Sequence, residues 1–157
     1  METLQEAKEY LRENFTKGSN CPCCSQFVKL YKRKLASTPS RMLIKLNYLG
    51  DGWHHVSKLV KGISLTGSND FSKLAYWQLI EEKQNTDEDK KTSGFWRITT
   101  KGVLFVENKI KIPSHVFIFN GKKMFSVGNR GFSDKTINIV DCLGKKFSYN
   151  ELMNNDK

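Results

Sequence analysis

Long apolar runs are absent from this sequence of 157 residues, and no window approaches the roughly 18 apolar residues that a membrane-crossing helix needs. The first ten residues carry three glutamates and no apolar segment, which is not the pattern of a secretory signal. Three of the four cysteines are crowded into positions 21–24 instead of being spaced as in a disulfide framework. These absences favour a cytoplasmic protein with reduced thiols that makes no contact with a membrane.

Catalytic motifs are also missing. The sequence contains no nucleophile elbow, no phosphate-binding glycine loop and no metalloprotease motif. Cys142 and His115 are residue types that nucleophilic catalysis uses, but isolated residues of these types are far more often structural. We therefore expect a protein that is not an enzyme.

Acidic residues are unevenly distributed, and none occurs between Phe27 and Gly50. The whole sequence has 26 Lys and Arg against 16 Asp and Glu, a formal net charge of +10. Residues 27–61 alone hold eight of the basic residues and one acid, Asp51. A surface of this kind attracts phosphate polymers because binding releases their counterions. The charge favours nucleic-acid binding and, equally, an ordinary basic surface that keeps the protein soluble.

Two helices joined by a cysteine-rich turn are predicted for an N-terminal helical arm, residues 1–37. The first is amphipathic, since apolar residues recur at helical spacing from Leu4 to Phe15. The second is expected over Phe27–Leu35, with its apolar side facing inward. Its outward side carries the densest basic run in the chain, which is Lys29, Lys32, Arg33 and Lys34. We expect these side chains to contact phosphates, although charge runs are usually solvated surface.

In the turn of this arm, Cys21 and Cys24 have the two-residue spacing with which a zinc knuckle grips one tetrahedral ion. A closed site needs further ligands, and no second spaced pair exists among the remaining candidates, which are Cys23, Cys142, His54, His55 and His115. A structural zinc ion held by Cys21, Cys24 and Cys23 is one interpretation. A redox dithiol and reduced cysteines without a role are the alternatives.

The central part, residues 38–108, predicts a helix, a short strand, a short helix, a longer helix and two strands, in that order. Thr38 and Pro39 open the first helix as its cap and first helical residue, and Gly50 ends it. The longer helix follows residues of the N-cap type at 68–70. Its inward face is expected to hold Phe71, Leu74, Ala75 and Leu79.

Three stretches of this part, "GWHHV", "LAYWQLIEE" and "GFWRITTKGVLFV", resemble the first strand, recognition helix and wing of winged helix-turn-helix DNA-binding domains. The resemblance covers residues 38–108 and implies an α+β fold with a winged-helix core. "CPCC" followed by "VKLYKRKL" is also similar to small phage or prophage proteins of unassigned role. Together these resemblances imply a small phage-type or bacterial regulator of transcription that binds double-stranded DNA.

Residues of the longer helix are expected to face solvent and contact bases. Asn can read adenine, Lys can contact guanine and Ser can contact either base. The expected base-contacting set is Asn69, Ser72, Lys73 and Tyr76. Arg41, on the preceding helix, is expected to join the basic residues that contact DNA.

The C-terminal part, residues 109–157, is expected to be a β-hairpin extension followed by a terminal helix. Asn120 and Gly121 form a strong two-residue hairpin turn within residues 110–127. A further strand is expected over residues 136–140. This extension is a candidate surface for a partner protein, a ligand or a second copy in a homodimer.

An acidic loop favours a second function. The expected wing carries Asp87, Glu88 and Asp89, and acidic side chains are repelled by the phosphate backbone. The alternative to a DNA-binding regulator is therefore a protein–protein interaction module. Such a module would dock on a host or partner protein, and inhibit or adapt a larger nucleic-acid machine.

Overall fold

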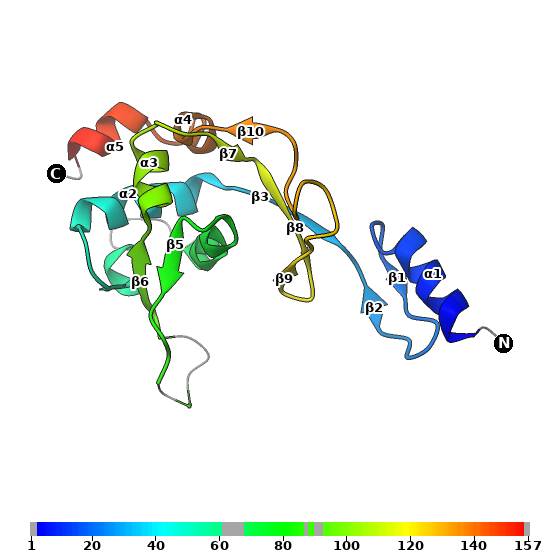
Figure 1. Cartoon of the computed structure of the whole chain (residues 1–157). Coiled ribbons are helices and arrows are strands. Elements are labelled where there is room, and N and C mark those ends of the chain that lie inside the picture. The colour runs from blue at the N-terminus through cyan, green and yellow to red at the C-terminus, as the bar shows by residue number, and fades with distance from the viewer. Residues whose placement is uncertain (1–2, 61–67, 87, 90–92, 156–157) are drawn as a thin grey trace. The chain divides into compact units, whose positions relative to one another are not determined.

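The protein has a mixed α+β fold with small antiparallel sheets, as the sequence predicted (Figure 1). The structure is a computed structural model that describes residues 3–60, 68–86, 88–89 and 93–155. Within these residues, no helix combines the length and the apolar composition that a bilayer crossing requires.

The chain divides into two compact units. Unit 1 comprises residues 1–34 and 115–134, and unit 2 comprises residues 35–114 and 135–157. This division differs from the predicted one at 37/38 and 108/109, because the predicted C-terminal extension is shared between the two units. Its first strands pair with the N-terminal segment, whereas its last helices belong to unit 2.

Unit 1 begins with α1 (Leu4–Asn14), the predicted amphipathic helix. Thr3 and Glu6 form a capping box, in which the Thr3 hydroxyl accepts from the Glu6 N–H at 3.2 Å and the Glu6 carboxylate accepts from the Thr3 N–H at 2.9 Å. Strands β1 (Ser19–Asn20) and β2 (Phe27–Val28) then pair antiparallel. The cysteine-rich turn therefore closes a hairpin.

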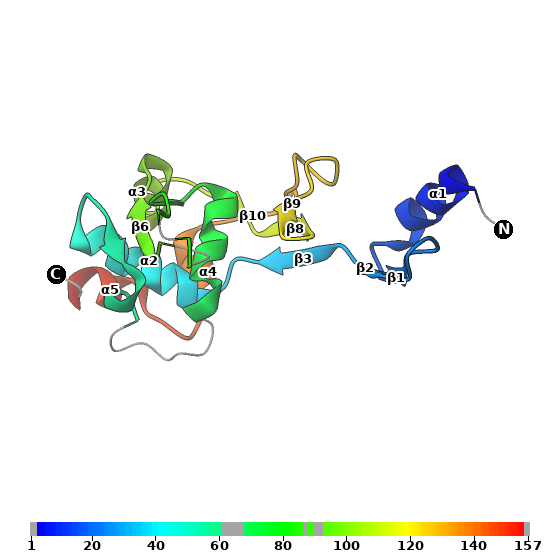
Figure 2. The ribbon, with the colours of Figure 1, turned by 90° about the horizontal axis from the view of Figure 1, so that it is seen from below.

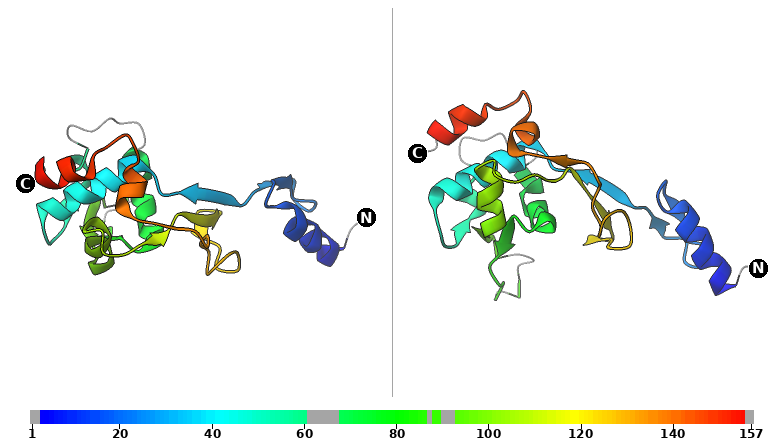
Figure 3. Two further views of the ribbon diagram at one scale, coloured as in Figure 1. Left: turned by 90° about the horizontal axis from the view of Figure 1, so that it is seen from above. Right: turned by 45° about the horizontal axis from the view of Figure 1, so that its top comes forward.

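The predicted helix over Phe27–Leu35 is wrong. These residues form β2 and then β3 (Tyr31–Lys34), which pairs antiparallel with the distant strand β8 (His115–Phe119), as Figure 3 shows. Lys and Arg are good helix formers, but pairing with β8, a strand rich in Val, Ile and Phe, outweighs that local preference. Leu30 and Leu35, expected on one helix face, are buried at the two ends of β3.

β9 (Lys122–Lys123) completes the sheet, in the order β3-β8-β9. The predicted turn at Asn120 and Gly121 is confirmed, since both residues have positive φ, 52° and 76°, as a tight hairpin requires. The rest of the predicted hairpin is different. β7 (Ile112–Pro113) pairs with β10 (Thr136–Ile137) within unit 2.

Unit 2 follows the predicted order of elements through its central part (Figure 2). These elements are α2 (Ser37–Leu49), β4 (His54–His55), η1 (Val56–Lys58), η2 (Ser68–Trp77), β5 (Ile80–Glu82), β6 (Phe95–Ile98) and α3 (Thr100–Val106). The three strands form an antiparallel sheet in the order β4-β6-β5. The predicted start of α2 is wrong, because the N-cap is Ala36 and Thr38 already lies inside the helix. α2 ends at Leu49 with Gly50 as its C-cap, as expected.

η2 is a 3₁₀ helix rather than the expected α-helix. Because three residues complete each turn, Phe71, Leu74 and Trp77 share the inward line, and each is 1% exposed. Ala75, which an α-helical period places inside, is exposed, whereas Leu79 is buried as predicted. The Trp77 Nε1–H donates to a backbone carbonyl oxygen of β7 at 2.7 Å.

Two short helices, α4 (Ile139–Leu143) and α5 (Tyr149–Asn155), close unit 2. The strand predicted over residues 136–140 ends early, because the Asn138 side chain caps α4 by accepting from the Asp141 N–H at 2.8 Å. The predicted terminal helix is present as α5.

Candidate nucleic-acid interface

β3 carries most of the basic residues that the sequence assigned to phosphate contacts. All four of its side chains, the Tyr-Lys-Arg-Lys of residues 31–34, are exposed. β3 is an edge strand of its sheet, and strands packed on a core normally hide one of their two sides. Here both sides are open, so the predicted cations are accessible but lie on a strand instead of a helix.

One face of the sheet carries Tyr31, Arg33 and Lys123. Tyr31 and Lys123 both lie opposite Ile118 in the register, and Arg33 follows two residues after Tyr31 on the same strand. The Tyr31 ring has two cations near it, with the Lys29 Nζ at 5.4 Å and the Arg33 Cζ at 5.0 Å from its centroid. Both distances are within the range of cation–π attraction.

The reverse face carries Lys32, Lys34 and Lys122. Phe117 lies opposite Lys32, with the Lys32 Nζ 5.9 Å from its ring centroid, and Phe119 lies opposite Lys122. β3, β8 and β9 contain no acid. The sheet is therefore basic on both faces, with aromatic rings beside the cations. Proteins use this combination to hold phosphates and to stack on bases.

The loop after β9 extends the same chemistry. The Lys123 Nζ lies 4.7 Å from the Phe125 ring centroid and 4.3 Å from that of Phe132. The Phe125 side chain is 67% exposed. An apolar ring left this open beside a lysine is a surface on which a base can stack.

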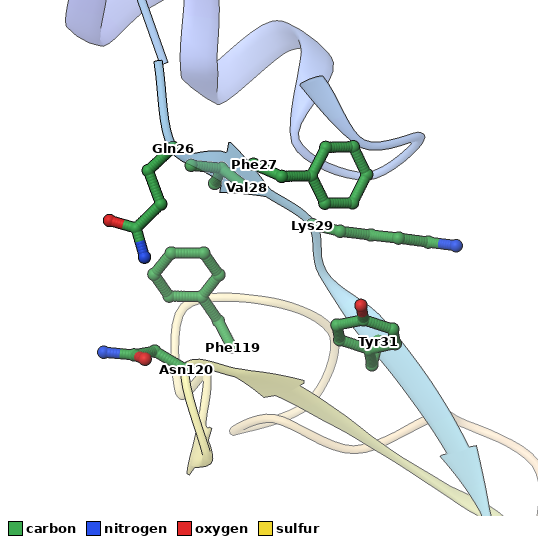
Figure 4. A pocket seen from close by; sticks show the side chains of 7 residues that line it. All are labelled: Gln26, Phe27, Val28, Lys29, Tyr31, Phe119 and Asn120. Atoms are coloured by element: carbon green, nitrogen blue, oxygen red, sulfur yellow. The ribbon is translucent and has the colours of Figure 1, made fainter. Parts of the chain in front are cut away.

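A hollow of about 410 Å³ lies between β2, β3 and the β8–β9 turn (Figure 4). Its lining residues are Gln26, Phe27, Val28, Lys29, Tyr31, Phe119 and Asn120. In Figure 4 the Phe119 ring stands between the amides of Gln26 and Asn120, while Phe27 and Lys29 extend to the other side. Rings of this kind stack on bases, and amides hydrogen-bond with base edges. The hollow therefore has the chemistry to hold an unpaired base.

Sequence reasoning missed most of these rings and amides. A helix over Phe27–Leu35 turns Tyr31 toward the core, and it gives Phe119 and Asn120 no connection to the basic run. The available signal was the apolar run over residues 116–119, which is typical of a buried strand and therefore requires a partner strand, although it does not identify that partner.

The predicted base-contacting residues lie on η2, in unit 2. Ser72 is exposed, Lys73 and Tyr76 are half-buried, and together they line a shallow hollow of about 270 Å³. The Lys73 Nζ is 2.6 Å from the Asp70 Oδ1, so a neighbouring carboxylate offsets its charge. The Asn69 side chain falls outside the described residues. Base contact remains a prediction for this set.

Arg41 lies on α2 in unit 2, whereas β3 belongs to unit 1. Its Cζ is 5.2 Å from the Phe147 ring centroid, and the Lys146 Nζ is 5.3 Å from the same ring. Lys146 also donates to the Thr38 Oγ1 at 3.2 Å. Arg41 thus belongs to a second group of cations and aromatics, which ties α2 to the C-terminal segment.

The β5–β6 hairpin is electrostatically different from the β3 sheet. Arg97 donates to one oxygen of Glu81 through Nε at 2.9 Å and Nη2 at 2.6 Å, so its charge is compensated within the hairpin. In the expected acidic tip, Glu88 and Asp89 are exposed, and Asp87 falls outside the described residues. This hairpin offers less attraction to phosphate than β3 does.

Cys21, Cys23 and Cys24 lie in the turn between β1 and β2, and no disulfide joins them. In the part of the chain that the structure describes, which includes every Cys and His, no group of three or more Cys, His, Asp or Glu is arranged to hold a metal ion. The predicted zinc site, with three ligands from this turn, is therefore not assembled by those residues.

No protein-family model, no curated protein and no solved structure matches this chain. The functional assignment therefore depends on the residues and geometry of the two units. The most informative of these are the exposed cations and rings of the β3-β8-β9 sheet.

Proposed function

We propose that this chain binds double-stranded DNA and that β3 makes its main phosphate contacts. The observation that carries the proposal is a sheet that is basic on both faces, with Lys32, Arg33 and Lys34 exposed on its edge strand and no acid among its strands. Cations in such an arrangement gain free energy from counterion release whatever the base sequence. They position a duplex without specifying it.

Unit 2 is proposed to read the sequence as a winged-helix domain, as in a small regulator of transcription. Three features support this role: the order α2-β4-η1-η2-β5-β6, the packing of η2 against α2, and the sheet order β4-β6-β5. In this proposal η2 enters the major groove. Ser72, Lys73 and Tyr76 then meet base edges.

A salt series of fluorescence anisotropy on a labelled random-sequence duplex tests the role of β3. The triple variant Lys32→Ala, Arg33→Ala, Lys34→Ala should weaken binding to all duplexes similarly. It should also flatten the plot of log affinity against log salt by roughly 3, at about 0.9 per phosphate contact. Lysines on an edge strand also oppose edge-to-edge pairing, so the molecular mass of each variant must be checked.

The matched control removes three cations from unit 1 outside the sheet. Lys8, Arg12 and Lys17 are exposed on and just after α1, and their replacement by Ala changes the net charge equally. The control should leave the salt slope nearly unchanged. No binding of the wild-type protein at low salt would remove the proposal. An equal loss in both triple variants would remove β3 as the contact site.

One observation favours the second candidate, a protein–protein module that acts on a nucleic-acid machine. Glu88 and Asp89 are exposed near the end of the β5–β6 hairpin, where a duplex-binding wing would carry basic residues. Capture of one defined partner from source-cell lysate would support this function if it survives nuclease treatment and is lost in the variant Glu88→Gln, Asp89→Asn. Capture that nuclease abolishes would support DNA binding instead.

A further inference from the structure

Backbone hydrogen bonds close the turn between β1 and β2, which carries three cysteines. The Cys21 N–H donates to the Gln26 carbonyl at 2.7 Å, and the Ser25 N–H donates to the Cys21 carbonyl at 2.8 Å. Ser25 has a φ of 64°, in the left-handed region that most side chains avoid. These bonds bring residues 21–24 into one tight turn, so both members of the Cys-x-x-Cys pair lie on the same small loop.

The Cys21 sulfur lies within hydrogen-bonding reach of its partner in the pair. The backbone N–H groups of Cys24 and Cys23 and the Cys24 thiol all approach it. The thiolate is the form that binds metals. Hydrogen bonds from backbone N–H groups to a ligating sulfur also belong to the outer shell that orients metal ligands.

Within the described residues, no group of three or more Cys, His, Asp or Glu is arranged to hold a metal ion, so this pair has no third ligand in its own chain. The His54 Nε2 is 3.0 Å from the Gly50 carbonyl oxygen, and the His55 Nδ1 is 2.9 Å from the Ser57 Oγ, so both imidazoles are engaged in unit 2. Cys142 is buried in α4. A structural zinc site needs four ligands in a tetrahedron, and Cys21 with Cys24 supplies two.

We propose that Cys21 and Cys24 form half of a four-thiolate zinc site that a second copy of this chain completes. The turn is open for this purpose, since Cys21 is half-exposed and residues 22–25 are exposed. Two identical pairs give the closed four-cysteine set of structural zinc. Each thiol releases its proton to solvent as its sulfur binds. The resulting site carries a charge of −2, which offsets part of the repulsion between two chains of formal charge +10.

Native mass spectrometry and light scattering during a zinc titration test the shared site, with phosphine reductant present to exclude disulfides. The wild-type protein should double its mass on zinc addition, bind one zinc per two chains, and return to monomer with a chelator. Replacing either ligand, by Cys21→Ser or Cys24→Ser, should weaken zinc binding by more than roughly 100-fold, because loss of outer-shell partners alone costs 10–100-fold.

Cys23→Ser is the matched control, since Cys23 is exposed in the same turn and is not a ligand in this proposal. It should retain the zinc-dependent dimer. Cobalt(II) in place of zinc should give the charge-transfer absorption of a tetrahedral thiolate site, and circular dichroism should show that every variant is folded. One zinc per monomer, no retained zinc, or a dimer that Cys23→Ser abolishes would each overturn the proposal.

Discussion

The β3-β8-β9 sheet of unit 1 and the β4-β6-β5 sheet of unit 2 are both small, three-stranded and antiparallel. In unit 2 the single arginine of the sheet is paired with Glu81, and Trp96 and Ile98 of the central strand are buried. In unit 1 the sheet has no acid, and all four residues of its edge strand are exposed. The arginine of the unit 2 sheet is thus compensated by a neighbouring carboxylate, whereas the cations of the unit 1 sheet are accessible to an anionic partner.

The two units also differ in how many apolar side chains they bury. Among the described residues, the buried apolar side chains of unit 1 are Ala7, Leu30, Val116 and Ile118. Unit 2 buries far more, including Phe71, Trp77 and Trp96. Apolar burial is the main source of stability, so substitutions in unit 2 should act on stability first, and substitutions in the β3 sheet should act on binding first.

The largest expected effect is on the core of unit 2. Trp77→Ala removes a side chain that is 1% exposed and whose indole N–H donates at 2.7 Å. It should lower the free energy of unfolding by about 3–5 kcal/mol, as measured by urea denaturation followed by circular dichroism. Trp53→Ala is the control, because Trp53 is half-buried and its loss should cost far less. Equal losses would mean that Trp77 does not anchor the core.

The next effect separates the two faces of the β3 sheet. The pair Lys32→Ala, Lys34→Ala removes cations from one face, and the pair Arg33→Ala, Lys123→Ala removes them from the other. A face that contacts phosphate should lose roughly tenfold in affinity at moderate salt, and the salt slope should fall by roughly 2. Anisotropy titrations at several salt concentrations measure both quantities. If neither pair changes the slope, the contrast between the sheets has no bearing on binding.

Local signals were sufficient for the parts of the fold that depend on nearby residues. The capped helix α1, the end of α2 at Gly50, the order of elements in unit 2 and the turn at Asn120 and Gly121 all follow from spacing, caps and turn residues. Each of these features is decided within a few positions along the chain.

The candidate site could not be predicted in the same way, because long-range pairing forms it. Residues 31–34 have good helical propensity and become a strand only through their register with β8. The pairing also moves Phe119 and Asn120 beside the basic run. η2 has 3.0 residues per turn instead of the 3.6 of an α-helix, so Trp77 rather than Ala75 faces the core. The spacing of apolar residues alone did not distinguish the two kinds of helix.

A smaller effect is expected at the docking of α5 in unit 2. The Tyr149 Oη donates to the Val106 carbonyl at 2.7 Å. Tyr149→Phe should lower the free energy of unfolding by about 0.5–1.5 kcal/mol, the net value of one such bond. Affinity for a random-sequence duplex, which the proposal assigns mainly to β3, should stay unchanged, because Tyr149 belongs to unit 2. A loss of that affinity in this variant would mean that unit 2 supplies a large share of the phosphate contacts.

Tyr149 also makes the free energy of unfolding depend on pH in the alkaline range. Burial and, second, the charge of Glu107 raise the pKa of Tyr149 above its ordinary value of about 10. The folded state therefore holds the phenol proton more tightly than the unfolded chain does. This stabilisation is fully present below the unfolded pKa and is lost as pH rises through the folded pKa. Urea denaturation from pH 8 upward should show a weaker alkaline loss in Tyr149→Phe.

The smallest effect tests the comparison between the sheets most directly, by making unit 2 resemble unit 1. Glu81→Gln removes the carboxylate that pairs with Arg97, and both side chains are nearly half exposed. Such an exposed pair contributes at most about 1 kcal/mol, so the free energy of unfolding should change little.

In this variant Arg97, whose Cζ lies 4.5 Å from the Trp53 ring centroid, would be an uncompensated cation beside an aromatic ring, as Arg33 is beside Tyr31. If internal pairing is what keeps the β4-β6-β5 sheet from attracting phosphate, the salt slope of DNA binding should become steeper by up to about 0.9. Arg97→Gln is the control, because it lowers the net charge whereas Glu81→Gln raises it, and it should leave the slope unchanged. A slope that steepens in Glu81→Gln and flattens by as much in Arg97→Gln would show that each charge acts only through the net charge of the protein.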